Sequence, residues 1–207
     1  MNSKRQGTLQ SFLIKHGIIC YTILFTITFT LAYSPFIIAG KTLIWEIDGR
    51  RQHFPALVYN GRYIRSIIHN LLNGNFTIPM FDFNMGAGAD IISTLNAYGL
   101  GDPLNLLSAM VPARYCEYIY IFLVVLRIYL SGLAFYFLCR YFKKRRIYTL
   151  IGSLIYSFSG FTIFNAVRHP DNFFSPMIQL PLLIIGVDLI LRKKKPFLFI
   201  ISVSTMG

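Results

Sequence analysis

Acidic residues and cysteines are scarce in this sequence. Only eight of its 207 residues are Asp or Glu, against 20 Lys and Arg, which leaves a net charge of +12. The three cysteines are odd in number and lie in or beside apolar stretches, so we predict no disulfide framework. Polar residues are few as well: 55% of the residues are hydrophobic and the mean hydropathy is +0.55, which excludes an ordinary soluble domain. We therefore expect an integral membrane protein.

Nucleotide-binding motifs are also missing. The glycines Gly86 and Gly88 would need a third glycine at position 91 to form a dinucleotide fingerprint, but Ile91 stands there. No Gly-Lys-Ser/Thr follows to form a P-loop. We interpret residues 81 to 90 as a tight, close-packed turn.

Four stretches are long and apolar enough to cross a bilayer, which takes roughly 20 mostly apolar residues. They are residues 17–39, 116–139, 147–167 and 173–191, and a fifth stretch begins at 197 and runs to 207. Eleven residues cannot cross a bilayer, so we expect residues 1–207 to be a single membrane domain truncated from a longer protein. Residues 91–111 are fairly apolar but carry Asn, Gly, Asp and Pro near their middle, and we expect them not to span.

The basic residues indicate how the spans are oriented. Twelve of the 20 Lys and Arg form three clusters, at residues 4–15, 140–146 and 192–195. With four spans all three clusters fall on one side, which the positive-inside rule makes cytoplasmic. We therefore predict a cytoplasmic tail at 1–16 and an extracytoplasmic loop at 40–115. The positive charge reflects this topology, and we expect no nucleic acid as a partner.

The 40–115 loop carries a helical pattern. Between Pro55 and Asn73 the apolar residues recur at helical spacing, with Arg62, Arg65 and His69 on the opposite face. The helix either lies in the membrane interface or packs on other protein with a solvated basic face. Asp102-Pro103 is typical of a helix start, and predicts a short helix through Met110.

Ionisable residues gather at two places on the predicted outer side. The first lies just beyond the first span and the second is the turn at 168–172 between the third and fourth spans, so the two could converge on one site. Arg127, near the centre of the second span, must face the protein interior. It either contacts a phosphate in a lipid-entry groove or pairs with a helix outside this sequence. The candidate substrate-binding residues are Arg50, Arg51, Gln52, His53, Arg127, Arg168 and His169.

These residue types suit transfer of a group from a phosphate to a hydroxyl. A carboxylate assists by removing the proton of the attacking hydroxyl; Asp48 is the first candidate and Glu46 the second. Arginines and a histidine nearby would stabilise the departing phosphate. Asp48 and Glu46 form no recognisable metal-ligand set, so we predict no cofactor, although a divalent metal could share the task. The alternative is that these are hydrated interfacial charges.

The order of several short motifs resembles the N-terminal part of the bacterial YfhO membrane proteins. They are Asp48 with Gln52 and Pro55, Gly86-Ala87-Gly88-Ala89-Asp90, Tyr98, Asp102-Pro103, Tyr156-Ser157-Phe158-Ser159-Gly160-Phe161, His169-Pro170 and Leu180-Pro181. The resemblance covers nearly the whole sequence. It implies an all-α polytopic protein of the bacterial plasma membrane, with a GT-C-like transmembrane helical bundle and a large first extracytoplasmic loop carrying interfacial helices.

The resemblance also implies an activity. It implies a GT-C-type glycosyltransferase, which takes a sugar from a polyprenyl-phosphate carrier and adds it to an envelope polymer such as lipoteichoic acid. In such enzymes an acidic residue of the first outer loop is typically catalytic, and Asp48 is the position that matches it. Two other classes stay open from the residues. An envelope-lipid transporter or flippase would also need intramembrane charge such as Arg127, although the four spans show no repeated halves. A non-catalytic membrane scaffold is the third.

Overall fold

Helices make up most of the chain, because lipid offers no hydrogen bonds and a helix satisfies its own backbone. The computed structural model describes residues 2–206, with the side chains of 16–171 and 173–206. Its main helices are α1 (Asn2–Ile38), α2 (Phe54–Leu72), α4 (Cys116–Tyr141), α5 (Arg146–Ser157), α6 (Gly160–Arg168), α7 (Pro176–Leu191) and α8 (Phe197–Ser204). In the described chain the strands are β1 (Phe81–Asp82) and β2 (Ala89–Asp90), which pair antiparallel. The predicted all-α membrane fold is confirmed.

The apolar helices differ in length. The apolar part of α1, from His16 to Ile38, and the segment Ala113–Tyr141 that contains α4 are each long enough to span a membrane. The predicted span 147–167 is broken into α5 and α6, which meet at 46°. α7 has 16 residues, fewer than the roughly 20 that a straight span needs. By length and composition the described helices thus include two candidate spans, or three if α5 and α6 cross as one, where the sequence predicted four.

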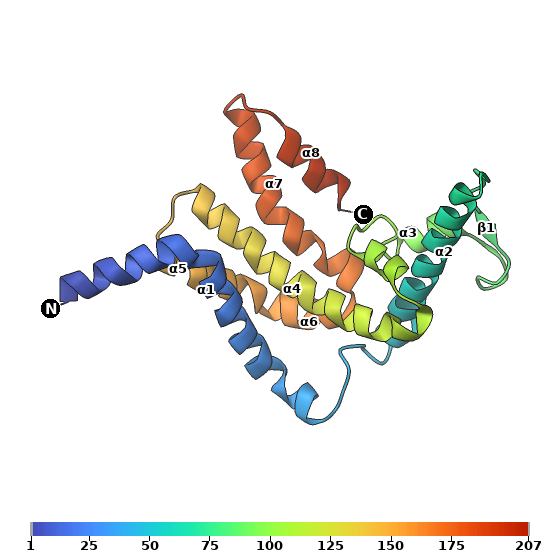
Figure 1. The fold of residues 1–207 in the computed structure, drawn as a ribbon, viewed down its shortest axis with the longest axis horizontal. Helices are drawn as coiled ribbons and strands as arrows, with labels where there is room; N and C mark the ends of the chain where they lie inside the picture. The colour runs from blue at the N-terminus through green and yellow to red at the C-terminus, as the bar shows by residue number, and fades with distance from the viewer. Residues whose placement is uncertain (1, 207) are drawn as a thin grey trace.

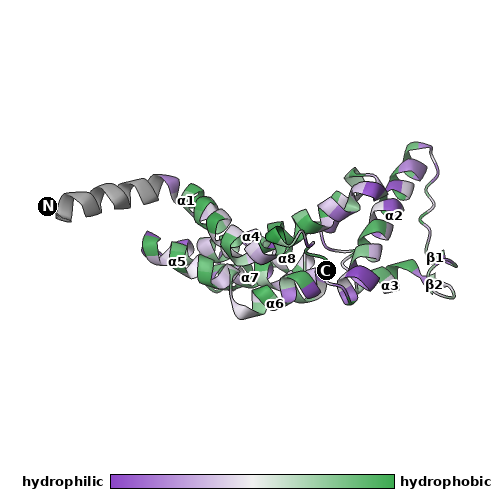
Figure 2. Cartoon of the chain, turned by 90° about the horizontal axis from the view of Figure 1, so that it is seen from below, coloured by the Kyte–Doolittle hydropathy of each residue, from purple (hydrophilic) through white to green (hydrophobic). Residues whose placement is uncertain are grey.

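α4 lies at the centre of the bundle, with α5 on one side and α7 on the other (Figure 1). Small residues let the backbones approach closely. Gly132 of α4 has no room for a Cβ, because Ser157 of α5 and Tyr21 of α1 already occupy that space. The Tyr21 hydroxyl donates to the Tyr129 carbonyl at 2.8 Å, which ties α1 to α4. Figure 2 shows mostly hydrophobic residues along this bundle and more hydrophilic residues on α2.

α2 packs on protein over its first half. Gly61 lies against the backbone of Ser108 in the 3₁₀ helix η2 (Asn105–Met110). Arg65 donates to three carbonyls at the end of η2, those of Ser108, Ala109 and Val111, at 3.1, 3.3 and 2.7 Å. The expectation of a solvated basic face is therefore wrong at Arg65, because its guanidinium binds orphan carbonyls of η2.

The remainder of the 40–115 loop is made of short elements. Gly86 and Gly88 have positive φ angles in the β1–β2 turn, as the predicted tight turn requires. Residues 91–111 form only α3 (Ile91–Asn96) and η2, which confirms that they do not make a spanning helix. The predicted short helix does end at Met110, but it begins three residues after Asp102 and is 3₁₀ in type.

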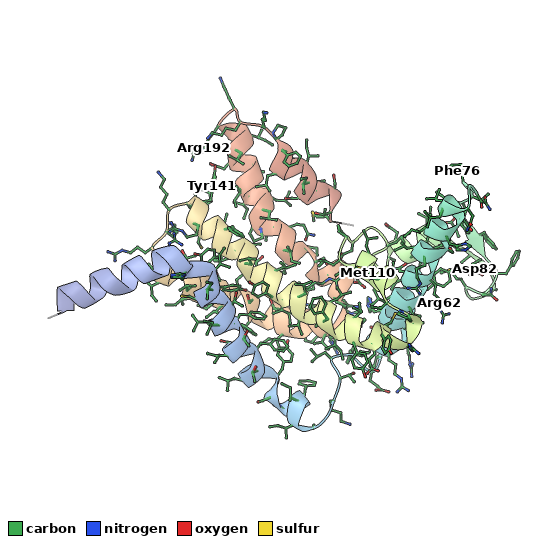
Figure 3. The ribbon with its side chains drawn as sticks, viewed as in Figure 1. Arg62, Phe76, Asp82, Met110, Tyr141 and Arg192 are labelled. Carbon is green, nitrogen blue, oxygen red and sulfur yellow. The ribbon has the colours of Figure 1, made fainter. Side chains whose placement is uncertain are left out.

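The two ends of the molecule carry different contacts. Asp188 of α7 accepts hydrogen bonds from Tyr141 and Arg192, both at 2.6 Å. Figure 3 places Tyr141 and Arg192 at one end, and Arg62 and Asp82 at the other. The basic cluster at 140–146 therefore lies at the end of α4 that is remote from α2.

Candidate functional site

Two π-helical turns deliver the central side chains of the site. η1 (Gly49–His53) leads into α2, and η4 (Pro170–Phe174) leads into α7. Such turns are rare and often occur at functional sites. They bring His53 Nδ1 to 3.3 Å from Asp171 Oδ2, although the two residues are 118 positions apart. Both side chains are buried.

Arg127 lies behind this pair and binds two carboxylates. Its Nη2 atom is 2.7 Å from Asp102 Oδ2 and 3.1 Å from Asp171 Oδ1. The same atom donates to Asn105 Oδ1 at 2.8 Å, and Nε donates to Ser175 Oγ at 3.2 Å. Burying a guanidinium costs several kcal/mol unless it is paired and hydrogen-bonded. The network meets that condition and joins α4 to the 40–115 loop and to η4.

Neither interpretation of Arg127 from the sequence matches this arrangement. The ion pair exists, but its partners Asp102 and Asp171 belong to this chain and not to a helix outside it. The phosphate contact is not supported, because the Arg127 residue is only 1% exposed. Arg127 instead holds two acidic residues in place.

His169 links the buried pair to Asp48. Its Nδ1 atom lies 3.1 Å from His53 Nε2, and its Nε2 atom lies 3.8 Å from Asp48 Oδ2. The other oxygen of Asp48 accepts a hydrogen bond from Gln52 Nε2 at 3.2 Å. The Asp48 and His169 side chains are 28% and 29% exposed, so a substrate can reach them. His53, by contrast, has both ring nitrogens engaged and no access for a phosphate.

A pocket of about 520 Å³ opens beside Gln52. Arg51, Gln52, Tyr59 and Tyr98 line it with several apolar residues, and the Tyr98 hydroxyl donates to Gln52 Oε1 at 3.0 Å. Burial and the hydrogen bond to Asp82 raise the pKa of Tyr59 to about 12, so its hydroxyl stays a donor. Gln52 therefore connects the pocket to Asp48 directly.

The other predicted residues are engaged with protein neighbours. Glu46 is highly exposed and pairs with Arg50 at 2.9 Å. The guanidinium of Arg168 stacks between the rings of Trp45 and Phe164, 4.0 Å from each centroid. Among the candidate arginines, Arg51 is the one that is exposed and lines the pocket.

Reasoning from sequence missed four members of the network: Asp102, Asn105, Asp171 and Ser175. Asp102 was recognised only as a cap, and one of its oxygens does accept the Leu104 N–H at 2.8 Å. The charge of Arg127 signalled that carboxylates must lie near it. Because seven of the eight acidic residues fall on the same side of the membrane in the predicted topology, the sequence could not show which of them pair with Arg127.

Within the described residues no three His, Cys, Asp or Glu side chains converge in a way that could hold a metal ion. The residues that do converge are carboxylates, two imidazoles and a buried guanidinium, at one end of an apolar helical bundle. Fold and site together define a helical membrane protein with an acid–base cluster at one end of its bundle.

The family follows from a comparison with known proteins. The sequence model of the family "Bacterial membrane protein YfhO" matches residues 19–206, so the chain belongs to the YfhO family. No curated protein and no solved structure matches this chain.

Proposed function

We propose that this protein is a GT-C-type glycosyltransferase that moves a sugar from a polyprenyl-phosphate carrier to a hydroxyl of an envelope polymer such as lipoteichoic acid, at the outer face of the membrane. Membership of the YfhO family supports this class. The observation that carries the proposal is the placement of Asp48. One oxygen accepts from Gln52, which lines the pocket, and the other lies 3.8 Å from His169 Nε2, on a side chain that is 28% exposed.

In this reaction the acceptor hydroxyl attacks C1 of the donor sugar. Its proton passes to Asp48 while the new O–C1 bond forms and the bond from C1 to the carrier phosphate breaks. The bonding electron pair leaves with the phosphate oxygen, where negative charge grows. Arg51 is the cation best placed to stabilise that charge, since it is exposed and lines the pocket.

The test replaces Asp48 with asparagine, which keeps the size of the side chain but removes its basicity. We expect Asp48→Asn to lower transfer by about 100- to 10,000-fold, the usual contribution of a general base. The measurement is incorporation of labelled sugar from a lipid-linked donor into the polymer, normalised to the amount of protein in the membrane. Glu117→Gln is the matched control, because Glu117 is an exposed carboxylate distant from Asp48 in the sequence.

Transfer by Asp48→Asn at close to the parent rate would show that Asp48 is not the base. Glu46→Gln would then be measured in the same assay. If that variant were also active, the enzyme proposal would give way to an envelope-lipid transporter, which needs no base.

A further inference from the structure

The protons of the two histidines can be assigned from their neighbours. Asp171 Oδ1 lies 3.1 Å from both Arg127 Nη2 and Asn105 Nδ2, so this carboxylate is held as an acceptor. His53 Nδ1, 3.3 Å from Asp171 Oδ2, must therefore be the donor. We take the buried His53 ring as neutral. A neutral imidazole has one donor and one acceptor, so His53 Nε2 is the acceptor.

The tautomer of His169 follows from that of His53. Since His53 Nε2 accepts, His169 Nδ1 at 3.1 Å must donate to it. The lone pair of His169 then lies on Nε2, which faces Asp48 Oδ2 at 3.8 Å. Two acceptors do not bond to each other, and 3.8 Å is indeed too long for a hydrogen bond. Asp48 thus has an unprotonated nitrogen beside it.

The surroundings of His169 favour its neutral form. Burial lowers the pKa of His169, the adjacent His53 and Arg168 lower it further, and only Asp48 acts in the opposite direction. Among the described side chains, the charged or titratable groups that act on the ring are these three, from η1, α6 and the segment before η1. The rings of Trp45 and Phe173 lie on its other sides, with centroids at 6.1 and 5.1 Å.

We propose that His169 is the second proton acceptor of this site, taking from Asp48 the proton that Asp48 removes from the acceptor hydroxyl. This inference rests on the proposed function. In atoms, the hydroxyl O–H bond breaks onto Asp48, and the resulting carboxylic acid turns toward His169 and gives its proton to Nε2. The imidazolium is stabilised through His53 by Asp171, and it later releases the proton to water. His53 and Asp171 are positioning residues that fix the tautomer.

The first measurement reads the tautomers directly and needs no activity. Solid-state ¹⁵N NMR of the histidine-labelled protein in lipid, at pH 7.5, should show two neutral rings protonated on Nδ1, the less common tautomer. His169→Gln should remove one of these two signals, which assigns that signal to His169. A proton on Nε2 of His169 would overturn the proposal, whatever the protein catalyses.

The second measurement is the pH profile of sugar transfer. We expect His169→Gln to lower kcat at least about tenfold with KM little changed, a smaller loss than removal of the base itself. The parent should lose activity as the pH falls through the pKa of His169, which lies below the ordinary histidine value of about 6.5, because a protonated His169 cannot accept. That acid limb should disappear in His169→Gln, which a purely structural role would not cause.

His69→Gln is the matched control, since His69 is an exposed histidine whose ring nitrogens lie 3.3 Å from Asn73 Nδ2. A His169→Gln variant with the parent kcat and an unchanged acid limb would overturn the proposal. Absence of sugar transfer in the parent would overturn the proposed function instead, and the NMR tautomers would then decide the assignment of His169 alone.

Discussion

At the scale of single residues, the most consequential side chain is Arg127. Its guanidinium contacts Asp102 and Asn105 of the 40–115 loop and Asp171 and Ser175 at η4, so it joins α4 to two distant parts of the chain. Arg127 is therefore both the neutralising charge of the site and the link that holds its walls together. Arg127 supports the proposed role of Asp48 indirectly, because it holds Asp171, which contacts His53, and His53 contacts the His169 that lies beside Asp48.

We predict that Arg127→Gln destabilises the protein strongly. It leaves two buried carboxylates without a cation, and removing one partner of a buried ion pair typically costs about 3 to 5 kcal/mol. Arg50→Gln removes the same group from an exposed pair with Glu46 and should change stability little. Thermal unfolding of the two purified variants in the same detergent is the measurement. Equal unfolding temperatures would show that the network does not stabilise the fold.

At the scale of elements, close packing of helices sets the geometry of the bundle. Gly132 of α4 lies where α5 and α1 both approach, beside Ser153 and Ser157. The bend between α5 and α6 follows at residues 158 and 159, where the Ser159 hydroxyl accepts the Thr162 N–H at 3.3 Å and caps α6. Hydropathy predicted one span over residues 147–167, because it averages over a window of residues and does not detect a helix cap inside that window.

We predict that Gly132→Ala loosens this packing. An added Cβ would overlap with Ser157 and Tyr21, and overpacking a well-packed core typically costs about 1 to 3 kcal/mol. Gly160→Ala is the control, since a Cβ at Gly160, at the start of α6, meets nothing within 4 Å. Resistance of each variant to thermal unfolding in detergent measures the difference. A Gly132→Ala protein as stable as Gly160→Ala would mean that the helices can separate without cost.

At the scale of the whole molecule, polar and charged residues lie at two opposite ends of the apolar bundle. Tyr141 and Arg192 lie at one end and Arg62 and Asp82 at the other, as Figure 3 shows. The acid–base cluster around Asp48 belongs to the segments that precede α2 and α7. Sugar transfer outside the cell requires that this end faces outward.

We predict that residue 75 is extracytoplasmic and residue 144 cytoplasmic. The basic cluster at 140–146 should be retained inside by the positive-inside rule. In a background without Cys20, Cys116 and Cys139, a membrane-impermeant maleimide should label Asn75→Cys in intact cells, and Lys144→Cys only after the membrane is opened. Both positions are exposed, so access to the reagent is comparable. The reverse labelling pattern would place the site on the cytoplasmic side and exclude transfer outside.

The local properties of this protein were determined by the sequence alone. The four predicted apolar stretches are largely helical, although 147–167 is broken into α5 and α6, and α2 ends at Asn73-Gly74. Asp48 and the 168–172 turn were recognised as candidates for one site. These follow from hydropathy, periodicity and turn chemistry, which act between near neighbours. Only the tertiary structure decided that Asp102 and Asp171 pair with Arg127, and that His53 and His169 stand between Asp171 and Asp48. Ion pairing and tautomers depend on distances between segments more than 20 residues apart, and those distances exist only after the helices have packed.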